Sequence, residues 1–252
     1  MCGRFSLFAD DDELVSLFDI DLLEGENTPF VRSSWNVAPS QSIVTVMDRM
    51  RVVADSGQVV ADAREPRAAG ERYERRREAR HITWGLMPSW AKPDFHPLIN
   101  ARAETITSKP SFRSAASKRR ILVPANGSYE WQKNAAAPSG PKQPWWLSAG
   151  AGDPLMAFAG IADVRPVGDS WDATCAIITR PAPDAVGEIH DRVPVVVPAD
   201  LWDAWLDPET TDKDAVDGLL AAIPAPTLVP RKVGRAVGNV RNNGPELLDP
   251  VD

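Results

Sequence analysis

Short apolar runs separated by proline and glycine recur along most of the chain. Their lengths and their content of β-branched and aromatic residues are typical of β-strands. We expect strands at residues 42–46, 81–87, 121–125, 128–132, 144–147, 155–162, 173–179 and 193–197. Because many of the 23 prolines lie between these runs, the pattern predicts strands that are joined by turns.

Apolar residues at helical spacing occur early in the chain and again near its end. The acidic residues 10–13 precede Leu14 and Phe18, which is typical of a helix N-terminus. The segments 200–206 and 212–222 also repeat apolar residues at helical spacing. We therefore expect an α+β fold with a mixed, barrel-like β-sheet core and peripheral helices. Since the chain has no internal repeat and no clear linker, residues 1–252 are expected to form a single domain.

Residues 51–80 depart from this pattern. They include eight arginines and six acidic residues, with little apolar periodicity before Ile82. Such a composition buries little apolar surface. We expect a solvated, charged loop or hairpin insertion at about 51–80.

The composition excludes several classes of protein. The chain is 43% hydrophobic and 25% charged, as is usual for a globular protein. It has no apolar run near the roughly 20 residues that cross a bilayer. Its N-terminus lacks the features of a secretory signal, so we expect a cytoplasmic protein with no membrane partner. Two cysteines and three histidines, none at ligand spacing, predict no disulfide framework, no metal and no cofactor.

The charge is unevenly distributed. A net charge of −7 argues against a protein that coats DNA generally. However, residues 100–120 hold six basic residues against the single acid Glu104, and residues 231–241 hold four basic residues and no acid. These stretches fit a short nucleic-acid contact, but two solvated faces explain the charge equally well.

Cys2 becomes chemically distinctive if Met1 is removed. Residue 2 then carries an α-amine with a pKa of about 8 beside a thiol with a pKa of about 8.5. Such an amine forms a Schiff base with an aldehyde. The neighbouring thiol can then close a five-membered thiazolidine ring, because the reaction is intramolecular. The alternative is that Cys2 is an ordinary small residue in a frayed terminus.

Seven short motifs, each present once, lie in order along nearly the whole chain. They are MCGRF at 1–5, WNVAPS at 35–40, WGLMPSWA at 84–91, LINARAET at 98–105, NGSYEW at 126–131, EIHDRVPV at 188–195 and RAVGNVRNNG at 235–244. Through these motifs the sequence resembles the SRAP family, the SOS response-associated peptidases or abasic site processing proteins. The resemblance implies a SRAP-like fold and a DNA-repair protein that forms a covalent crosslink with abasic sites through Cys2.

The resemblance also implies roles for three further residues. Asn100 is expected to hydrogen-bond near Cys2 and the sugar, since an amide both donates and accepts. Glu130 would carry protons to or from the Cys2 amine, and His190 would help to open the deoxyribose ring. Taken alone, these residues are better explained as a turn asparagine, a solvent-facing strand glutamate and a structural histidine.

The resemblance further implies a DNA-binding surface. Arg4, Arg102 and Arg192 are expected to contact phosphates through their guanidinium groups. The other expected DNA contacts are Asn36, Pro39, Trp90, Lys109 and Arg113. Trp90 would stack on a base beside the lesion, although core packing is the usual role of a tryptophan. The chain departs from the family at Ala91, where some relatives have a second tryptophan, and at Pro110, where a basic residue is expected.

The implied partner is single-stranded DNA with abasic sites, at replication forks or at junctions with duplex DNA. We expect a monomer, associated with the nucleoid in a bacterium, with weak AP-lyase, crosslink-reversal and autoproteolytic activities. Two alternatives stay open. One is an N-terminal-nucleophile amidotransferase, in which Cys2 attacks glutamine. The other is a non-catalytic single-stranded DNA-binding module, in which binding is reversible and sensitive to salt.

Overall fold

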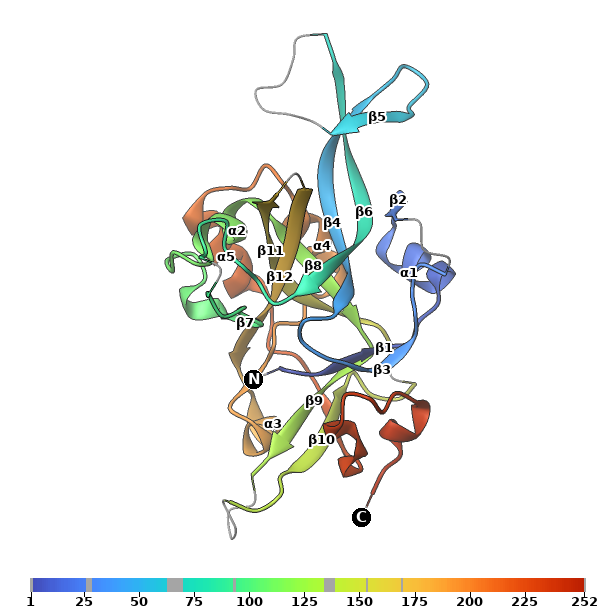
Figure 1. Cartoon of the computed structure of the whole chain (residues 1–252), viewed down its shortest axis with the longest axis vertical. Helices are drawn as coiled ribbons and strands as arrows, with labels where there is room; N and C mark the ends of the chain where they lie inside the picture. Colours follow the sequence, from blue (N-terminus) through green and yellow to red (C-terminus); the bar gives the residue numbers. More distant parts are fainter. Residues whose placement is uncertain are drawn as a thin grey trace.

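The computed structural model describes residues 2–25, 29–62, 70–92, 94–133, 139–152, 154–168 and 170–251. Within these ranges the strands form two sheets, one with nine strands, of which β5 and β7 lie off the main path, and one with five. Figure 1 shows the smaller sheet below the larger one. The larger sheet forms the barrel, and the smaller one carries the N-terminal strand.

Five strands of the larger sheet close into a barrel. They are β4 (Ser42–Val53), β6 (Arg72–Trp84), β8 (Arg120–Ala125), β11 (Met156–Val167) and β12 (Ser170–Pro181). Neighbours are antiparallel except at the closure, where β6 and β12 run parallel with Thr83 opposite Thr174. The expected α+β fold with a mixed, barrel-like core is confirmed.

The remaining strands extend the barrel or build the smaller sheet. On the barrel lie β2 (Leu22–Glu24), β5 (Val59–Asp62), β7 (Asn100–Arg102) and β13 (Arg192–Pro194). The smaller sheet has the order β14 (Val229–Lys232), β10 (Gln143–Ser148), β9 (Gly127–Gln132), β1 (Phe5–Leu7) and β3 (Ser34–Val37).

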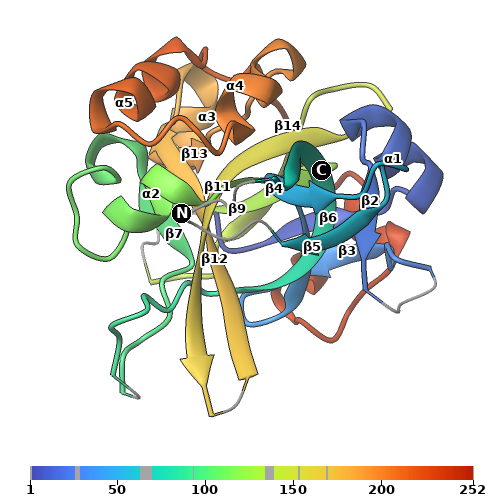
Figure 2. The ribbon, with the colours of Figure 1, turned by 90° about the horizontal axis from the view of Figure 1, so that it is seen from above.

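The helices lie around the strands, with α4 and α5 together on one side and α1 on another (Figure 2). The α-helices are α1 (Asp11–Phe18), α2 (Arg113–Lys118), α3 (Asp184–Ile189), α4 (Trp202–Leu206) and α5 (Lys213–Ala222). Short 3₁₀ turns are η1 (Ala103–Thr105), η2 (Ala199–Leu201), η3 (Arg235–Gly238) and η4 (Pro245–Leu248). The carboxylates of Asp10 and Asp212 cap α1 and α5 by accepting backbone N–H bonds. Among the described residues, no helix has the length and apolar character to span a bilayer.

Several strand ends differ from the expected ones. The strand expected at 42–46 continues to Val53, because its charged residues find partners across the sheet. The buried Arg51 pairs with Glu78 on β6 and with Glu24 on β2. The strand expected at 81–87 ends at Trp84, since Gly85 takes a φ of +140°. The strand expected at 193–197 ends at Pro194.

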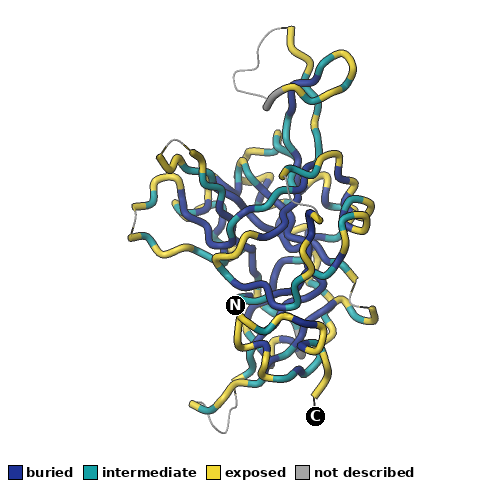
Figure 3. The backbone as a smooth tube through the Cα atoms, turned by 45° about the vertical axis from the view of Figure 1, so that its right-hand side comes forward, coloured by how far each residue is buried: buried dark blue, intermediate teal, exposed yellow. Residues whose placement is uncertain are grey.

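β4 and β6 form a long antiparallel hairpin that projects beyond the barrel (Figure 1). Its pairing runs from Ser42 opposite Thr83 to Val53 opposite Arg72. The charged stretch 51–80 therefore contributes the outer half of this hairpin together with β5, while residues 63–69 lie outside the described residues. The tube in Figure 3 is mostly buried through the barrel, whereas toward the hairpin tip β6 becomes half-buried or exposed and the end of β4 stays buried.

One glycine on β9 is required by packing. A Cβ on Gly127 would lie 2.7 Å from the backbone oxygen of Leu147 and closer still to the Trp146 ring.

We therefore expect Gly127→Ala to lower the free energy of unfolding by about 1–3 kcal/mol, as overpacking usually does. Urea denaturation would measure this loss. Gly218→Ala is the matched control, because Gly218 lies in α5 with nothing within 4 Å of the new Cβ. The control should leave stability unchanged or raise it, and a similar loss in both variants would contradict the packing argument.

Candidate active site

The N-terminal strand is tied into the smaller sheet on both of its edges. β1 pairs with β9 through Phe5 opposite Ser128, and with β3 through Phe5 opposite Val37. The Tyr129 N–H donates to the Arg4 carbonyl at 2.9 Å, which continues the β1–β9 contact toward the N-terminus. As a result Cys2 is fully buried. Met1, whose removal the expected chemistry requires, lies outside the described residues.

Asn100 holds the backbone of Cys2. It begins β7, which lies parallel to β12 with Asn100 opposite Ile177. The Asn100 Nδ2 donates to the Cys2 carbonyl at 2.8 Å. The buried Asn100 Oδ1 receives no hydrogen bond from the part of the chain that the structure describes. The amide therefore fixes residue 2 and leaves one acceptor for an incoming group.

Glu130 and His190 face each other across the site. Glu130 lies on β9 and is buried, and its Oε2 is 3.8 Å from the His190 Nε2. The Arg192 N–H donates to the His190 Nδ1 at 3.1 Å, a contact that favours the neutral form with its proton on Nε2. The Asp191 carboxylate lies 2.8 Å from Nδ1 and would stabilise the protonated ring. At 3.8 Å the carboxyl and imidazole groups are too far apart for a direct hydrogen bond, so proton transfer between them requires a closer approach or one bridging water.

Burial shifts the pKa values of all three ionisable groups at the site. It raises the pKa of Glu130 to about 7, and the negative charge of Asp191 adds to this effect. Burial also lowers the pKa of His190 and raises that of the Cys2 thiol, which the charge of Glu130 raises further. Near neutral pH, Glu130 can therefore hold or release a proton, His190 is mostly neutral, and Cys2 is a thiol.

A pocket of about 270 Å³ opens beside Asn100. Arg102 and Lys109 line it, and Thr179 closes it from β12. Phe95, Leu98, Ser111 and Phe112 complete the wall. Two of the expected DNA-binding cations thus lie next to a residue that touches Cys2, whereas Arg113 is exposed on α2 and does not line this pocket.

Arg4 and Asn36, which were expected to contact DNA, make protein contacts. The Arg4 Nη1 donates to the Asn36 Oδ1 at 2.5 Å and to the Val237 carbonyl at 2.8 Å. Asn36 is buried and donates through Nδ2 to the carbonyls of Asn239 at 3.0 Å and Asn242 at 2.8 Å. The two residues therefore anchor the C-terminal segment beneath the site, and their contact with DNA stays a prediction.

This anchoring role was not expected for either residue. The signal that could have indicated it is the last motif, residues 235–244, whose carbonyls accept these hydrogen bonds. Arg192, expected as a phosphate contact, also has a protein partner, since it forms a two-point ion pair with Glu104. Its contact with phosphate likewise stays a prediction.

The expected stacking residue is accessible. Trp90 is 57% exposed and packs edge-on against Phe95 with ring centroids 5.6 Å apart. Because Phe95 lines the pocket beside Asn100, Trp90 lies next to the wall of that pocket. Pro39 is partly exposed on the turn before β4. The stacking role of Trp90 is thus compatible with its exposure.

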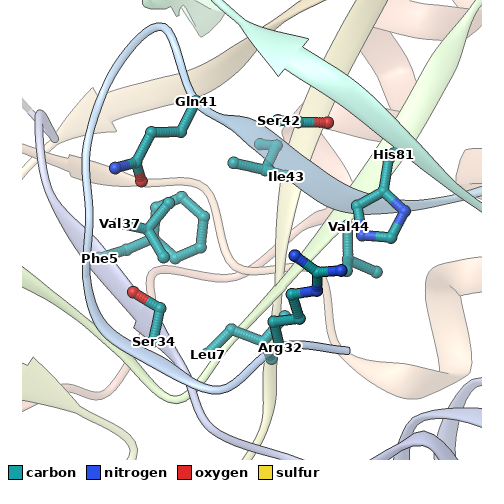
Figure 4. A pocket seen from close by; sticks show the side chains of 10 residues that line it. All are labelled: Phe5, Leu7, Arg32, Ser34, Val37, Gln41, Ser42, Ile43, Val44 and His81. Carbon is teal, nitrogen blue, oxygen red and sulfur yellow. The ribbon is translucent and has the colours of Figure 1, made fainter. Parts of the chain in front are cut away.

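A second pocket, of about 250 Å³, contains none of the expected catalytic residues (Figure 4). Phe5 and Ile43 contribute apolar walls, and Arg32 and His81 contribute the basic groups. Burial lowers the pKa of His81, and the charge of Arg32 lowers it further. No pattern in the sequence predicted this pocket.

Comparison with known proteins relates the chain to one family. The family model of the SOS response associated peptidases (SRAP) matches residues 1–240. The abasic site processing protein YoqW of Bacillus subtilis is 35% identical over 255 residues, which cover 99% of each chain. The abasic site processing protein YedK of Escherichia coli is 28% identical over the full length of both chains. A crystal structure of a Bacteroides thetaiotaomicron protein covers 99% of this chain and 100% of its own, with a TM-score of 0.72 and 19% identity, and shows the same fold.

The raised pKa of Glu130 predicts a pH-dependent stability. An unfolded glutamate titrates at about pH 4.3, whereas the pKa of the folded one is about 7. Between these values the folded state binds more protons than the unfolded state. As the pH rises between these two values, the contribution of Glu130 therefore lowers the free energy of unfolding. Above the folded pKa of about 7 this contribution no longer changes with pH.

Urea denaturation between pH 4.5 and 8 would measure this decline. Glu130→Gln should remove it, because the amide stays neutral. Glu188→Gln, at an exposed position two residues before His190, is the control and should follow the wild type. If wild type and Glu130→Gln had parallel profiles, the carboxyl would not have a raised pKa.

Proposed function

Because the chain belongs to the SRAP family of SOS response-associated peptidases, we propose that it captures abasic sites in single-stranded DNA covalently through Cys2. Curated relatives named abasic site processing proteins support the substrate class. The observation that carries the proposal is the burial of Cys2 against Asn100, with Glu130 and His190 facing each other at the same site. The DNA-repair role follows from the capture, since a crosslinked lesion is shielded.

The reaction begins after Met1 has been removed. The Cys2 amine adds to the C1′ aldehyde of the open sugar and water leaves, which gives a Schiff base. The Cys2 sulfur then adds to the imine carbon, and the thiol proton goes to the nitrogen. The product is a thiazolidine, in which one carbon is bonded to both nitrogen and sulfur. Ring closure is fast because both groups belong to one residue.

The neighbouring residues supply the proton transfers. His190, with a proton on Nε2, assists the opening of the deoxyribose ring to the aldehyde. Glu130 accepts a proton from the Cys2 amine and returns one to the leaving water, for which a pKa of about 7 is suited. Asn100 holds residue 2, and its Oδ1 accepts a hydrogen bond from the sugar.

The DNA strand runs past the pocket beside Asn100. Arg102 and Lys109 bind its phosphates there, and Trp90 stacks on a base next to the lesion. Arg113 extends this basic surface on α2. Where single-stranded DNA meets duplex DNA, as at a replication fork, an abasic site in the single strand would be unpaired beside this pocket.

The same Schiff base supports weaker side reactions. β-Elimination from the imine would give AP-lyase activity. Protonation of the sulfur by Glu130 would reopen the thiazolidine to the Schiff base, and addition of water to the imine would then release the aldehyde and the free Cys2 amine. Autoproteolysis would be limited to the removal of Met1 or a short leader.

The two cysteines provide a matched test of the covalent step. Cys2→Ser should abolish the SDS-stable product with an abasic oligonucleotide, because the ring needs sulfur. Cys175→Ser should retain it, since Cys175 is buried in β12, within the barrel. A denaturing gel measures the product, and intact mass spectrometry reports whether Met1 has been lost. Capture by a protein that still carries Met1, or by Cys2→Ser, would refute the mechanism.

The rate of capture tests the roles of the two proposed proton carriers. Glu130→Ala and His190→Ala should each slow capture by roughly 100-fold, within the usual range for general acid–base catalysis. Binding of the same DNA should change little, because neither side chain lines the pocket with Arg102 and Lys109. Single-turnover gel assays and fluorescence anisotropy measure the two quantities. Capture at the wild-type rate in either variant would remove the role assigned to that residue.

A further inference from the structure

The pocket of Figure 4 combines an apolar floor with a polar rim. The floor is formed by side chains of the core, namely Phe5, Leu7, Val37, Ile43 and Val44. The rim is formed by Arg32, Ser34, Gln41, Ser42 and His81. Figure 4 shows Arg32 and His81 together at one end of the floor and Gln41 at the other. At about 250 Å³ the pocket is smaller than the roughly 300–1,000 Å³ of drug-sized ligand sites, so it suits a small group such as one planar ring.

Arg32 supplies the one full positive charge of the pocket. Within the described ranges, Arg32 forms no ion pair and no carboxylate lines the pocket. Burial lowers the pKa of His81 and the charge of Arg32 lowers it further, so this ring is mostly neutral near pH 7. The charge of Asp11 acts on His81 in the opposite direction, but both Asp11 oxygens already accept backbone N–H bonds, from Phe30 at 2.8 Å and Val31 at 2.6 Å. The pocket therefore matches a group with a single negative charge.

Hydrogen bonds of the β3–β4 turn link the pocket to the candidate active site. The Ser40 N–H donates to the Trp84 carbonyl at 2.7 Å, and the Trp84 N–H donates to the Gln41 carbonyl at 2.9 Å. The Trp84 Nε1 donates in turn to the carbonyl of Ile99, the residue before Asn100, at 2.8 Å. One network of hydrogen bonds thus joins the rim of the pocket to the start of β7, where Asn100 holds Cys2.

The pocket is also close to Cys2 along the N-terminal strand. Phe5 follows Cys2 by three residues, which span at most roughly 11 Å. One DNA strand covers such a distance in about three nucleotides, since its rise is roughly 3.4 Å per nucleotide. Pro39, an expected DNA contact, is partly exposed on the turn before Gln41. A strand whose abasic site is held at Cys2 can therefore reach the pocket across this turn.

We propose that the pocket is a nucleotide-binding subsite, in which Arg32 binds one phosphodiester and the apolar floor receives the attached base. The proposal rests on the proposed function, since it places the lesion at Cys2. A phosphodiester carries one negative charge, which the single charge of Arg32 balances. Arg102 and Lys109 then hold the strand on one side of the lesion, and Arg32 holds it on the other.

The His81 ring reports whether the pocket is occupied. The chain has three histidines, so their imidazole NMR signals can be resolved, and His81→Gln identifies those of His81. In a Cys2→Ser background, an intact thymidine hexanucleotide should shift the His81 signals, and Arg32→Gln should abolish most of this shift. Unchanged His81 signals at the highest oligonucleotide concentration would overturn the proposal.

The affinity for the same hexanucleotide tests the phosphate contact. Arg32→Gln should weaken binding roughly two- to fivefold, the range for one exposed ion pair. The slope of log K against log salt should become less negative by about 0.7, the value for one phosphate contact on a single strand. Fluorescence anisotropy over a series of salt concentrations measures both quantities.

Arg72→Gln is the matched control for charge. Arg72 is an exposed arginine at the outer part of the β4–β6 hairpin, away from the pocket (Figure 1). This variant should bind the hexanucleotide as the parent does. An equal loss of affinity in both variants would make the effect of Arg32 a general effect of charge, and the subsite would be wrong.

Thymidine monophosphate distinguishes a free nucleotide from a strand. Its phosphate monoester carries close to two negative charges at pH 7, so it should fit the single charge of Arg32 less well than a phosphodiester does. If it shifted the His81 signals at a lower concentration than the hexanucleotide, the pocket would hold free nucleotides and its assignment to a DNA strand would be wrong.

Crosslinked strands locate the subsite relative to the lesion. Wild-type protein is crosslinked to abasic oligonucleotides that extend by increasing lengths on only the 5′ side or only the 3′ side of the lesion. The His81 signals should shift in one of the two series, once the strand extends by about three nucleotides. Crosslinks without a His81 shift in either series would overturn the proposal. Failure to crosslink would instead contradict the proposed function, and the intact hexanucleotide, whose binding does not use Cys2, would still decide the subsite.

Discussion

The pairing of β1 on both of its edges is the constraint on which the site depends. Chain termini usually fray unless they are tied down, but here β9 and β3 hold the strand that begins three residues after Cys2. The Phe5 ring anchors the strand against Trp84 and Phe158 inside the barrel, with centroids 5.3 and 6.4 Å away. Because of this pairing, residue 2 belongs to the core, and the groups from β7 and β9 can be arranged around it.

Burial then determines the protonation of the site. Removing water disfavours every charged form, so the pKa of a carboxyl or thiol rises and that of an imidazole falls. The pKa of Glu130 rises to about 7, whereas that of His190 falls. A carboxyl group with a pKa near the working pH is suited to carry protons. The fold thereby gives two common residue types a reactivity that they lack on an exposed strand.

The fold class and most strands could be predicted from the sequence, because apolar runs of strand length between prolines are a local signal. The outer half of β4 could not, since Arg51 is stabilised there by Glu24 and Glu78 from other strands. The same limit applies to Asn36, whose partners lie some 200 residues away. Asn100, Glu130 and His190 were identified through motifs and meet at the site, whereas Glu104 was counted only as a charge, because its partner Arg192 is distant in sequence.

The hydrogen bond from Arg4 to the Val237 carbonyl has a consequence for biosynthesis. Val237 is translated 233 residues after Arg4, and β9 is also translated well after the N-terminal strand. At roughly 5–20 residues per second, the N-terminus therefore stays unenclosed for many seconds. The removal of Met1 that the proposed function requires would fall within this interval, before these segments enclose residue 2.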